Sequence, residues 1–110
     1  MLSQKERLSG SEVLRVLKKG KRTSFGGLKI VALAPAPASQ ASVVVSAKIN
    51  KRATQRNTIR RRVYQIISPI LPDLKTPAQL VIYLYWDCSK TPQEEIKQSI
   101  VQCLKKLSLI

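Results

Sequence analysis

The residues with the clearest chemistry in this chain are the cations of one short segment, KRATQRNTIRRRVYQ, residues 51–65. Six of its 15 residues are Lys or Arg and none is acidic. The planar guanidinium of Arg binds phosphate oxygens through two parallel hydrogen bonds and also stacks on nucleobases. An ordinary solvated helix face mixes both signs of charge. The segment therefore predicts a surface that binds RNA or DNA.

The charge of the whole chain points the same way. In 110 residues, 20 Lys and Arg oppose 6 Asp and Glu, which gives a net charge of +14. Residues 13–72 hold 13 of these cations and no carboxylate, whereas residues 73–110 are nearly balanced. Such an imbalance favours a polyanionic partner. Nucleic acid is the first candidate and an anionic membrane surface is the second.

Composition also excludes several kinds of site. The chain has no His, which excludes a His-based catalytic triad and a His-containing zinc site. The acidic residues after residue 72 are few and lie outside the basic segment, which argues against an independent metal-dependent nuclease. Cys88 and Cys103 are expected to be free thiols in a reducing compartment. No apolar run is long enough to span a bilayer and the N-terminus MLSQKERLSG lacks a signal-peptide core, so a cytoplasmic protein is expected.

Hydrophobic periodicity places the basic segment within one domain, residues 1–110. We expect strands over residues 28–34, 41–47 and 79–86, with the proline-bearing stretch 34–40 as a connection. Helices are expected over 11–20, through the basic segment to about residue 67, and from about residue 92. The order α-β-β-α-β-α predicts a small two-layer α+β or α/β sandwich, in which helices pack on one sheet.

The helical period divides the basic segment into faces. At about 100° per residue, Ile59, Val63 and Ile66 form the stripe that packs on the sheet. Arg62 lies on one flank of that stripe, and the candidate RNA contacts lie on the other flank and before the helix. These candidates are Lys48, Lys51, Arg52, Arg56, Asn57, Arg60 and Arg61. At the helix start, free N–H groups and the helix dipole add to the attraction for phosphate. For Asn57, an ordinary surface amide that bonds water is an equally good interpretation.

Residues 43–62, VVVSAKINKRATQRNTIRRR, resemble the signature of the bacterial ribonuclease P protein subunit. In that family a valine-rich strand ending in Ser leads through a Lys-rich turn into K-x-A-x-x-R-N-x-x-K/R-R. The motif positions here are occupied by Ala53, Arg56, Asn57, Arg60 and Arg61. Upstream, SEVLRVLKKGKR resembles the first helix of the family, and the order of elements agrees. The resemblance thus covers nearly the whole chain.

The chain departs from the family pattern in three places. Val13 and Leu17 stand where the family often has Phe, and Tyr64 stands where a further basic residue is common. The turn KINKR, residues 48–52, is one residue longer than the commonest form. The first departure puts in doubt an aromatic site for the substrate, whereas the motif itself is intact.

The resemblance implies a specific role. Ribonuclease P removes the 5′ leader of precursor tRNA, and its catalyst is a large RNA. Magnesium is held mainly by that RNA and the substrate, so the protein alone is expected to hold no metal and to cleave nothing. The expected partners are the catalytic RNA, through the basic helix, and precursor tRNA, with no membrane and no small-molecule substrate. The family's β-α-β crossover is left-handed, which is rare.

The resemblance also implies a cleft for the single-stranded leader, between the sheet, the central helix and the first helix. The candidate cleft residues are Val13, Leu17, Phe25, Lys29, Val31 and Tyr64. Strand alternation places Lys29 and Val31 on one face. Ordinary core packing is the competing interpretation for the apolar residues, and a loop anchor is the one for Phe25. A ribosomal or other structural RNA-binding protein is the alternative function that composition leaves open.

Overall fold

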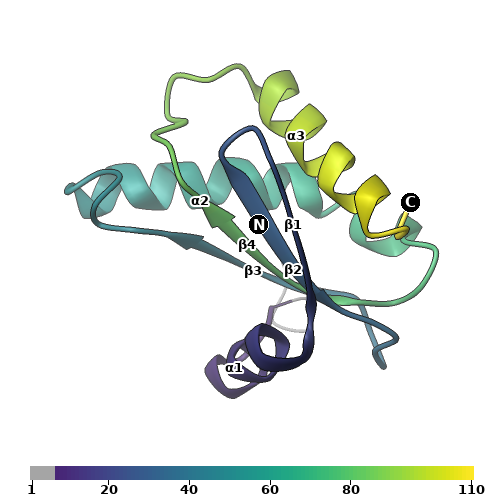
Figure 1. The fold of residues 1–110 in the computed structure, drawn as a ribbon. Helices are drawn as coiled ribbons and strands as arrows, with labels where there is room; N and C mark the ends of the chain where they lie inside the picture. Colours follow the sequence, from purple (N-terminus) through teal and green to yellow (C-terminus); the bar gives the residue numbers. More distant parts are fainter. Residues whose placement is uncertain (1–6) are drawn as a thin grey trace.

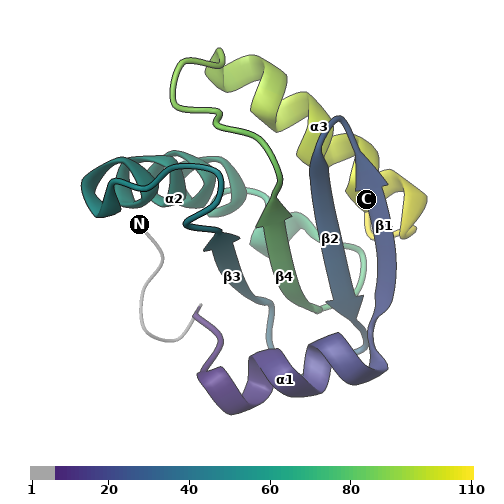
Figure 2. The same cartoon turned by 60° about the vertical axis from the view of Figure 1, so that its left-hand side comes forward.

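One four-stranded sheet separates two unequal layers of helices in the computed structural model, which describes residues 7–110 (Figure 1). The helices α2 and α3 cover one face of the sheet, and α1 lies across the other (Figure 2). The strand order is β1-β2-β4-β3, with β3 and β4 parallel and the other pairs antiparallel. The elements are α1 Gly10–Lys19, β1 Lys21–Phe25, β2 Leu28–Leu33, β3 Gln40–Val45, α2 Ala53–Ile67, the 3-10 helix η2 Leu71–Asp73, β4 Gln79–Leu84 and α3 Gln93–Lys106.

The predicted order of elements and the mixed α+β fold are confirmed. The prediction of two layers is corrected, because α1 forms a third layer on the face of the sheet opposite α2 and α3. The structure also adds one strand that the sequence did not indicate. That strand, β1, pairs with β2 as a hairpin through Gly26 and Gly27, whose φ angles of 59° and 81° lie in the left-handed region. Most of β1 is exposed. Because an exposed edge strand needs no alternating hydrophobic residues, KRTSF carried no strand signal.

The connection from β3 through α2 to β4 has an unusual hand. In Figure 2 both strands run upward, β4 lies to the right of β3, and α2 lies behind them. A parallel crossover with this arrangement is left-handed, whereas nearly all such crossovers are right-handed. The structure therefore has the hand that the family resemblance implied.

Two apolar cores lie on opposite faces of the sheet. The larger one joins the sheet to α2 and α3, and its fully buried members include Ile59, Val63 and Ile100. The smaller one joins Val16 of α1 to Val31 and Val81 of the sheet. At the end of α1, a Cβ on Gly20 would lie 2.8 Å from the carbonyl oxygen of Ala32 in β2. Glycine at this position therefore allows α1 to end in close contact with the sheet.

No helix within residues 7–110 is both long and apolar enough to cross a bilayer. The helix α2 includes residues 53–65 of the basic segment, so charged side chains interrupt its apolar surface.

We predict that both thiols are slow to react in the folded protein. Cys88 and Cys103 are buried and unpaired, and burial raises the pKa of each thiol above its ordinary value. A raised pKa lowers the thiolate fraction near pH 8, and the thiolate is the reactive form. Titration with a thiol reagent should find two groups in denatured, unreduced protein and much slower labelling in native protein. A disulfide, or native thiols that react at the denatured rate, would contradict this prediction.

Candidate nucleic-acid interface

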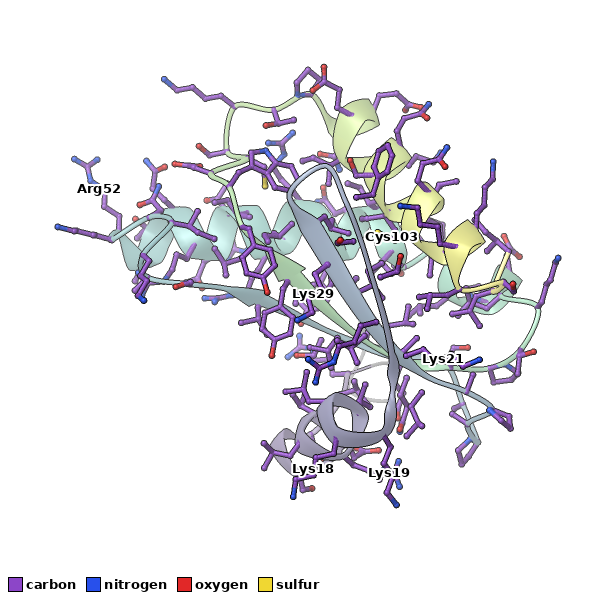
Figure 3. All side chains as sticks on the ribbon, viewed as in Figure 1. Lys18, Lys19, Lys21, Lys29, Arg52 and Cys103 are labelled. Carbon is purple, nitrogen blue, oxygen red and sulfur yellow. The ribbon has the colours of Figure 1, made fainter. Side chains whose placement is uncertain are left out.

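The cationic turn between β3 and α2, residues 46–52, has an ordered backbone. The Ser46 hydroxyl accepts a hydrogen bond from the Lys48 N–H at 3.1 Å, and the Ser46 carbonyl accepts one from the Ile49 N–H at 3.0 Å. The side chains of Lys48, Lys51 and Arg52 are exposed. Figure 3 shows Arg52 pointing away from the molecule at the start of α2. The turn therefore presents three cations on a defined backbone.

No side chain of α2 caps the N–H groups at its N-terminus. Its N-cap, Arg52, makes no side-chain capping bond, and no acidic residue occupies the first turn. In α1, by contrast, Ser9 and Glu12 form a complete capping box. The free N–H groups and dipole of α2 thus add positive potential to the cations of the turn. An anionic partner benefits from both.

Arg56 was predicted as an RNA contact, and the structure gives its guanidinium a second role. Nη1 of Arg56 donates to the main-chain carbonyls of Asn50 at 2.9 Å and Lys51 at 3.1 Å. These carbonyls belong to the cationic turn, so Arg56 binds the turn back onto α2. Its side chain is half-buried as a result.

Four predicted residues of α2 meet around one cationic pocket. Asn57, Arg60, Arg61 and Tyr64, together with Arg7, line a cavity of ≈ 340 Å³. Nη2 of Arg60 donates to Oδ1 of Asn57, so the amide orients the guanidinium instead of bonding only water. The hydroxyl of Tyr64 accepts from the Val43 N–H at 3.2 Å, on the outer edge of β3. The pocket combines several guanidinium groups, which suits a phosphate group.

Arg62 lies on the opposite flank, as the helical period predicts, and there it holds the loop between β4 and α3. Its Nη1 donates to the carbonyls of Cys88 at 2.5 Å and Ser89 at 3.0 Å, and its Nη2 donates to the carbonyl of Thr91. Nε donates to Oε1 of Gln93 at 3.1 Å. A guanidinium with this many protein acceptors is a structural element and not a solvated cation.

The sheet face beside α1 carries a row of polar and aromatic side chains. The Lys29 ammonium lies 5.7 Å from the centre of the Tyr83 ring, and the rings of Tyr83 and Tyr85 stack with centroids 6.2 Å apart. Tyr85 is 59% exposed. Neither tyrosine is among the candidate residues predicted from the sequence, although their spacing of two in YLY is the period of one strand face.

Of the six cleft candidates, three lie at this face with part of their surface accessible: Val13, Leu17 and Lys29. Val31 is on the same face but 0% exposed, so it belongs to the core under α1.

The other two cleft candidates, Phe25 and Tyr64, lie elsewhere. Phe25 pairs with Leu28, whose side chain faces the larger core, and the Lys106 ammonium lies 5.3 Å from the centre of the Phe25 ring. Phe25 therefore lies on the α3 side of the sheet. Tyr64 lines the cationic pocket at the edge of β3.

Metal-ligating groups are not gathered anywhere in the part of the chain that the structure describes. Residues 7–110 contain no cluster of three or more His, Cys, Asp or Glu that is suited to hold a metal ion. The chemistry of the described surface is therefore that of cations, amides and aromatic rings.

Comparison with known proteins identifies the chain's relatives. Residues 2–108 match the family model described as Ribonuclease P. A ribonuclease P protein component from Synechococcus is 28% identical over 117 aligned residues, covering 100% of this chain and 87% of that protein. A second one, from Picosynechococcus, is 27% identical over 90 residues, covering 81% of this chain and 78% of that protein.

Solved structures show the same fold. A Staphylococcus aureus RNase P protein, a mutant described as defective in mRNA degradation activity, superposes with a TM-score of 0.82 at 15% identity, covering 97% of this chain and 92% of that one. The RNase P protein from Thermotoga maritima superposes with a TM-score of 0.77 at 20% identity, covering 92% of this chain and 96% of that one. At such identities the likeness concerns the fold alone.

We predict that the flanking arginines of α2 separate into two classes when each is replaced by Ala. Arg60→Ala and Arg61→Ala should each lower the salt dependence of RNA binding, with a slope reduced by about 0.7–0.9 per lost phosphate contact. Both variants should melt near the wild-type temperature, because Ile59, Val63 and Ile66 provide the packing. Arg62→Ala should instead reduce the free energy of unfolding by about 2–4 kcal/mol, since it leaves several carbonyls without their charged donor.

The measurement is affinity for the catalytic RNA of a bacterial ribonuclease P across a salt series, together with a thermal melt of each variant. Arg61→Ala is the matched control for Arg62→Ala, because it removes the same charge from the preceding residue of the helix. Equal melting temperatures for these two variants would exclude the loop-holding role of Arg62. Equal salt slopes for all three would indicate a diffuse cationic surface.

Proposed function

Because the chain belongs to the ribonuclease P protein family, we propose that it is the protein subunit that assists ribonuclease P in removing the 5′ leader of precursor tRNA. The observation that carries the proposal is the family match over residues 2–108, which includes the basic helix and the sheet face beside α1. This extent also favours that role over the alternative, a ribosomal or other structural RNA-binding protein. The role combines a binding surface for the catalytic RNA with one for the substrate.

The catalytic RNA is the proposed partner of the cationic turn and the cationic pocket. Lys48, Lys51 and Arg52 are exposed on an ordered turn, and Arg60 and Arg61 border a cavity that suits a phosphate group. The two RNAs of the complex repel each other, and a small protein of net charge +14 lowers that repulsion by neutralising phosphates and releasing counterions. Cleavage itself, with its magnesium, is assigned to the catalytic RNA.

The 5′ leader is the proposed ligand of the sheet face beside α1. A leader varies in sequence, so its site must tolerate different bases. Stacking on Tyr83 and Tyr85 meets this need because every base has a π face, and Lys29 supplies a cation for the backbone. Val13 and Leu17 border this face with aliphatic surface. In this chain the aromatic contribution comes from the sheet, whereas in the family it often comes from the first helix.

Reconstitution with a ribonuclease P RNA at low magnesium concentration tests the proposal. Cleavage of precursor tRNA at the mature 5′ end should require the RNA, and adding the protein should raise the rate several-fold at magnesium concentrations where the RNA alone is slow. The protein alone should leave the substrate intact. Specific cleavage by the protein alone would overturn the assignment of catalysis to the RNA, and no effect of the protein on the RNA would overturn the proposal as a whole.

The same assay includes an untargeted transcript of equal length, incubated with the protein alone. Degradation of that transcript would instead indicate a general RNA-degrading activity. This control is included because the Staphylococcus aureus protein of the same fold is described as a mutant with defective mRNA degradation activity.

A second prediction concerns the missing aromatic residue of α1. Val13→Phe should tighten binding of precursor tRNA to the reconstituted enzyme by about 1–3 kcal/mol, the contribution of one base–aromatic stack. Affinity for mature tRNA, which has no leader, should stay unchanged. Leu14→Phe is the matched control, because Leu14 is 62% exposed and is not part of the small core that holds Val13. If the ratio of the two affinities moves equally in both variants, Val13 is not at the leader site.

A further inference from the structure

Asn50, in the cationic turn, makes an unusual number of contacts for a polar loop residue. Its Oδ1 accepts from the Arg52 N–H at 3.0 Å, and its main-chain carbonyl accepts from Nη1 of Arg56 at 2.9 Å. Its Nδ2 donates to Oε1 of Gln55 at 3.3 Å and to Oδ2 of Asp87 at 3.0 Å. One side chain thus joins the turn, the first turn of α2, and the loop that follows β4.

Asp87 is the distant partner in this set, 37 residues away in the sequence. Its Oδ1 accepts from the Ser89 N–H at 3.0 Å, which fixes the carboxylate within its own loop. That loop is in turn held by Arg62 through the carbonyls of Cys88 and Ser89. Asp87 is therefore fixed to α2 on one side and binds Asn50 on the other.

These bonds form a closed ring that begins and ends on α2. Arg62 of α2 holds the β4–α3 loop, Asp87 of that loop holds Asn50, and the turn around Asn50 is held by Arg56 of α2. The exposed cations Lys48, Lys51 and Arg52 belong to the same turn. The ring thus determines where the turn presents its charges.

A carboxylate at this location is unfavourable for binding a polyanion. Asp87 bonds Asn50 of the cationic turn and lines a cavity together with Lys48. Its negative charge repels phosphate and reduces the local positive potential. Its position is explained by its hydrogen bonds and not by its charge. We propose that Asn50 and Asp87 are positioning residues, which hold the cationic turn in the conformation that binds RNA. The inference rests on the proposed function, because it assumes that the turn contacts RNA.

The expected benefit is preorganisation. Fixing the backbone of each residue costs conformational entropy. When the ring orders residues 48–52 during folding, that cost does not recur when RNA binds. Without the ring, the same cations would still be present, but the turn would become ordered only when RNA binds, and the entropy cost would then reduce the affinity.

The test exchanges the two side chains. In the double variant Asn50→Asp with Asp87→Asn, Asp at position 50 still accepts from the Arg52 N–H, and Asn at position 87 still accepts from the Ser89 N–H. The bond between the two positions re-forms with the donor reversed, and the net charge stays at +14. In the single variant Asn50→Asp two carboxylates face each other. In Asp87→Asn two NH2 groups face each other without an acceptor, because both amide oxygens accept from backbone N–H groups. Both single variants should therefore loosen the turn.

Affinity for a ribonuclease P RNA is measured for the wild type, both single variants and the double variant, well below every melting temperature. Each single variant should bind about 3- to 10-fold more weakly. The double variant should return to within about two-fold of the wild type. Hydrogen exchange of the Arg52 amide should become faster in the single variants and recover in the double variant.

The decisive result is the sign of the effect of Asp87→Asn. Charge alone predicts tighter RNA binding, because a carboxylate has been removed, whereas positioning predicts weaker binding. Asp73→Asn is the charge control: it removes an exposed carboxylate from η2, which follows the other end of α2, and should leave binding unchanged or slightly tighter. Binding by Asp87→Asn that equals or exceeds that of the wild type would overturn the inference. Failure of the wild type to bind the RNA would instead overturn the proposed function.

Discussion

The packing of one apolar stripe of α2 against the sheet is the constraint on which the rest of this surface depends. Ile59, Val63 and Ile66 are buried in the larger core, so the helix has only one rotation about its axis that satisfies them. Each fully buried aliphatic side chain contributes about 1.5–3 kcal/mol, far more than any surface cation contributes to orientation. The directions of the charged side chains therefore follow from the hydrophobic ones. The direction of the proposed RNA-binding flank is thus determined by the packing of the protein alone.

Once α2 is oriented, its arginines form two groups, which differ in whether a main-chain carbonyl lies within reach of the guanidinium. Arg56 and Arg62 meet main-chain carbonyls of neighbouring loops, whereas Arg60 and Arg61 border a pocket. A guanidinium has five donors in a fixed plane, and this explains how one residue type performs both tasks. A count of cations therefore overstates the number that are available to an anionic partner, because Arg56 and Arg62 bond carbonyls of the protein itself.

The sequence predicts well what depends on a regular period, and poorly what depends on tertiary contacts. The flank of α2 that carries Arg60 and Arg61 follows from 3.6 residues per turn, and the order of the buried elements follows from their apolar runs. The strand β1 was missed because an exposed edge strand has no hydrophobic signal. The roles of Arg56, Arg62 and Asn50 were not predictable, because their acceptors come from other parts of the chain. Phe25 fell on the unexpected face because the hairpin that orients it had not been recognised.

The hydrogen bond from the Val43 N–H to the hydroxyl of Tyr64 affects how the protein behaves at high concentration. The strand β3 lies at the edge of the sheet, and a free row of N–H and C=O groups there is a template for pairing with another chain. Tyr64 occupies one of these donors, and the Leu8 N–H bonds the Ala41 carbonyl at 3.3 Å farther along the same strand. Both contacts block strand addition at this edge. They therefore hinder edge-to-edge pairing through β3, and this matters most where salt has screened the positive charge that otherwise keeps molecules apart.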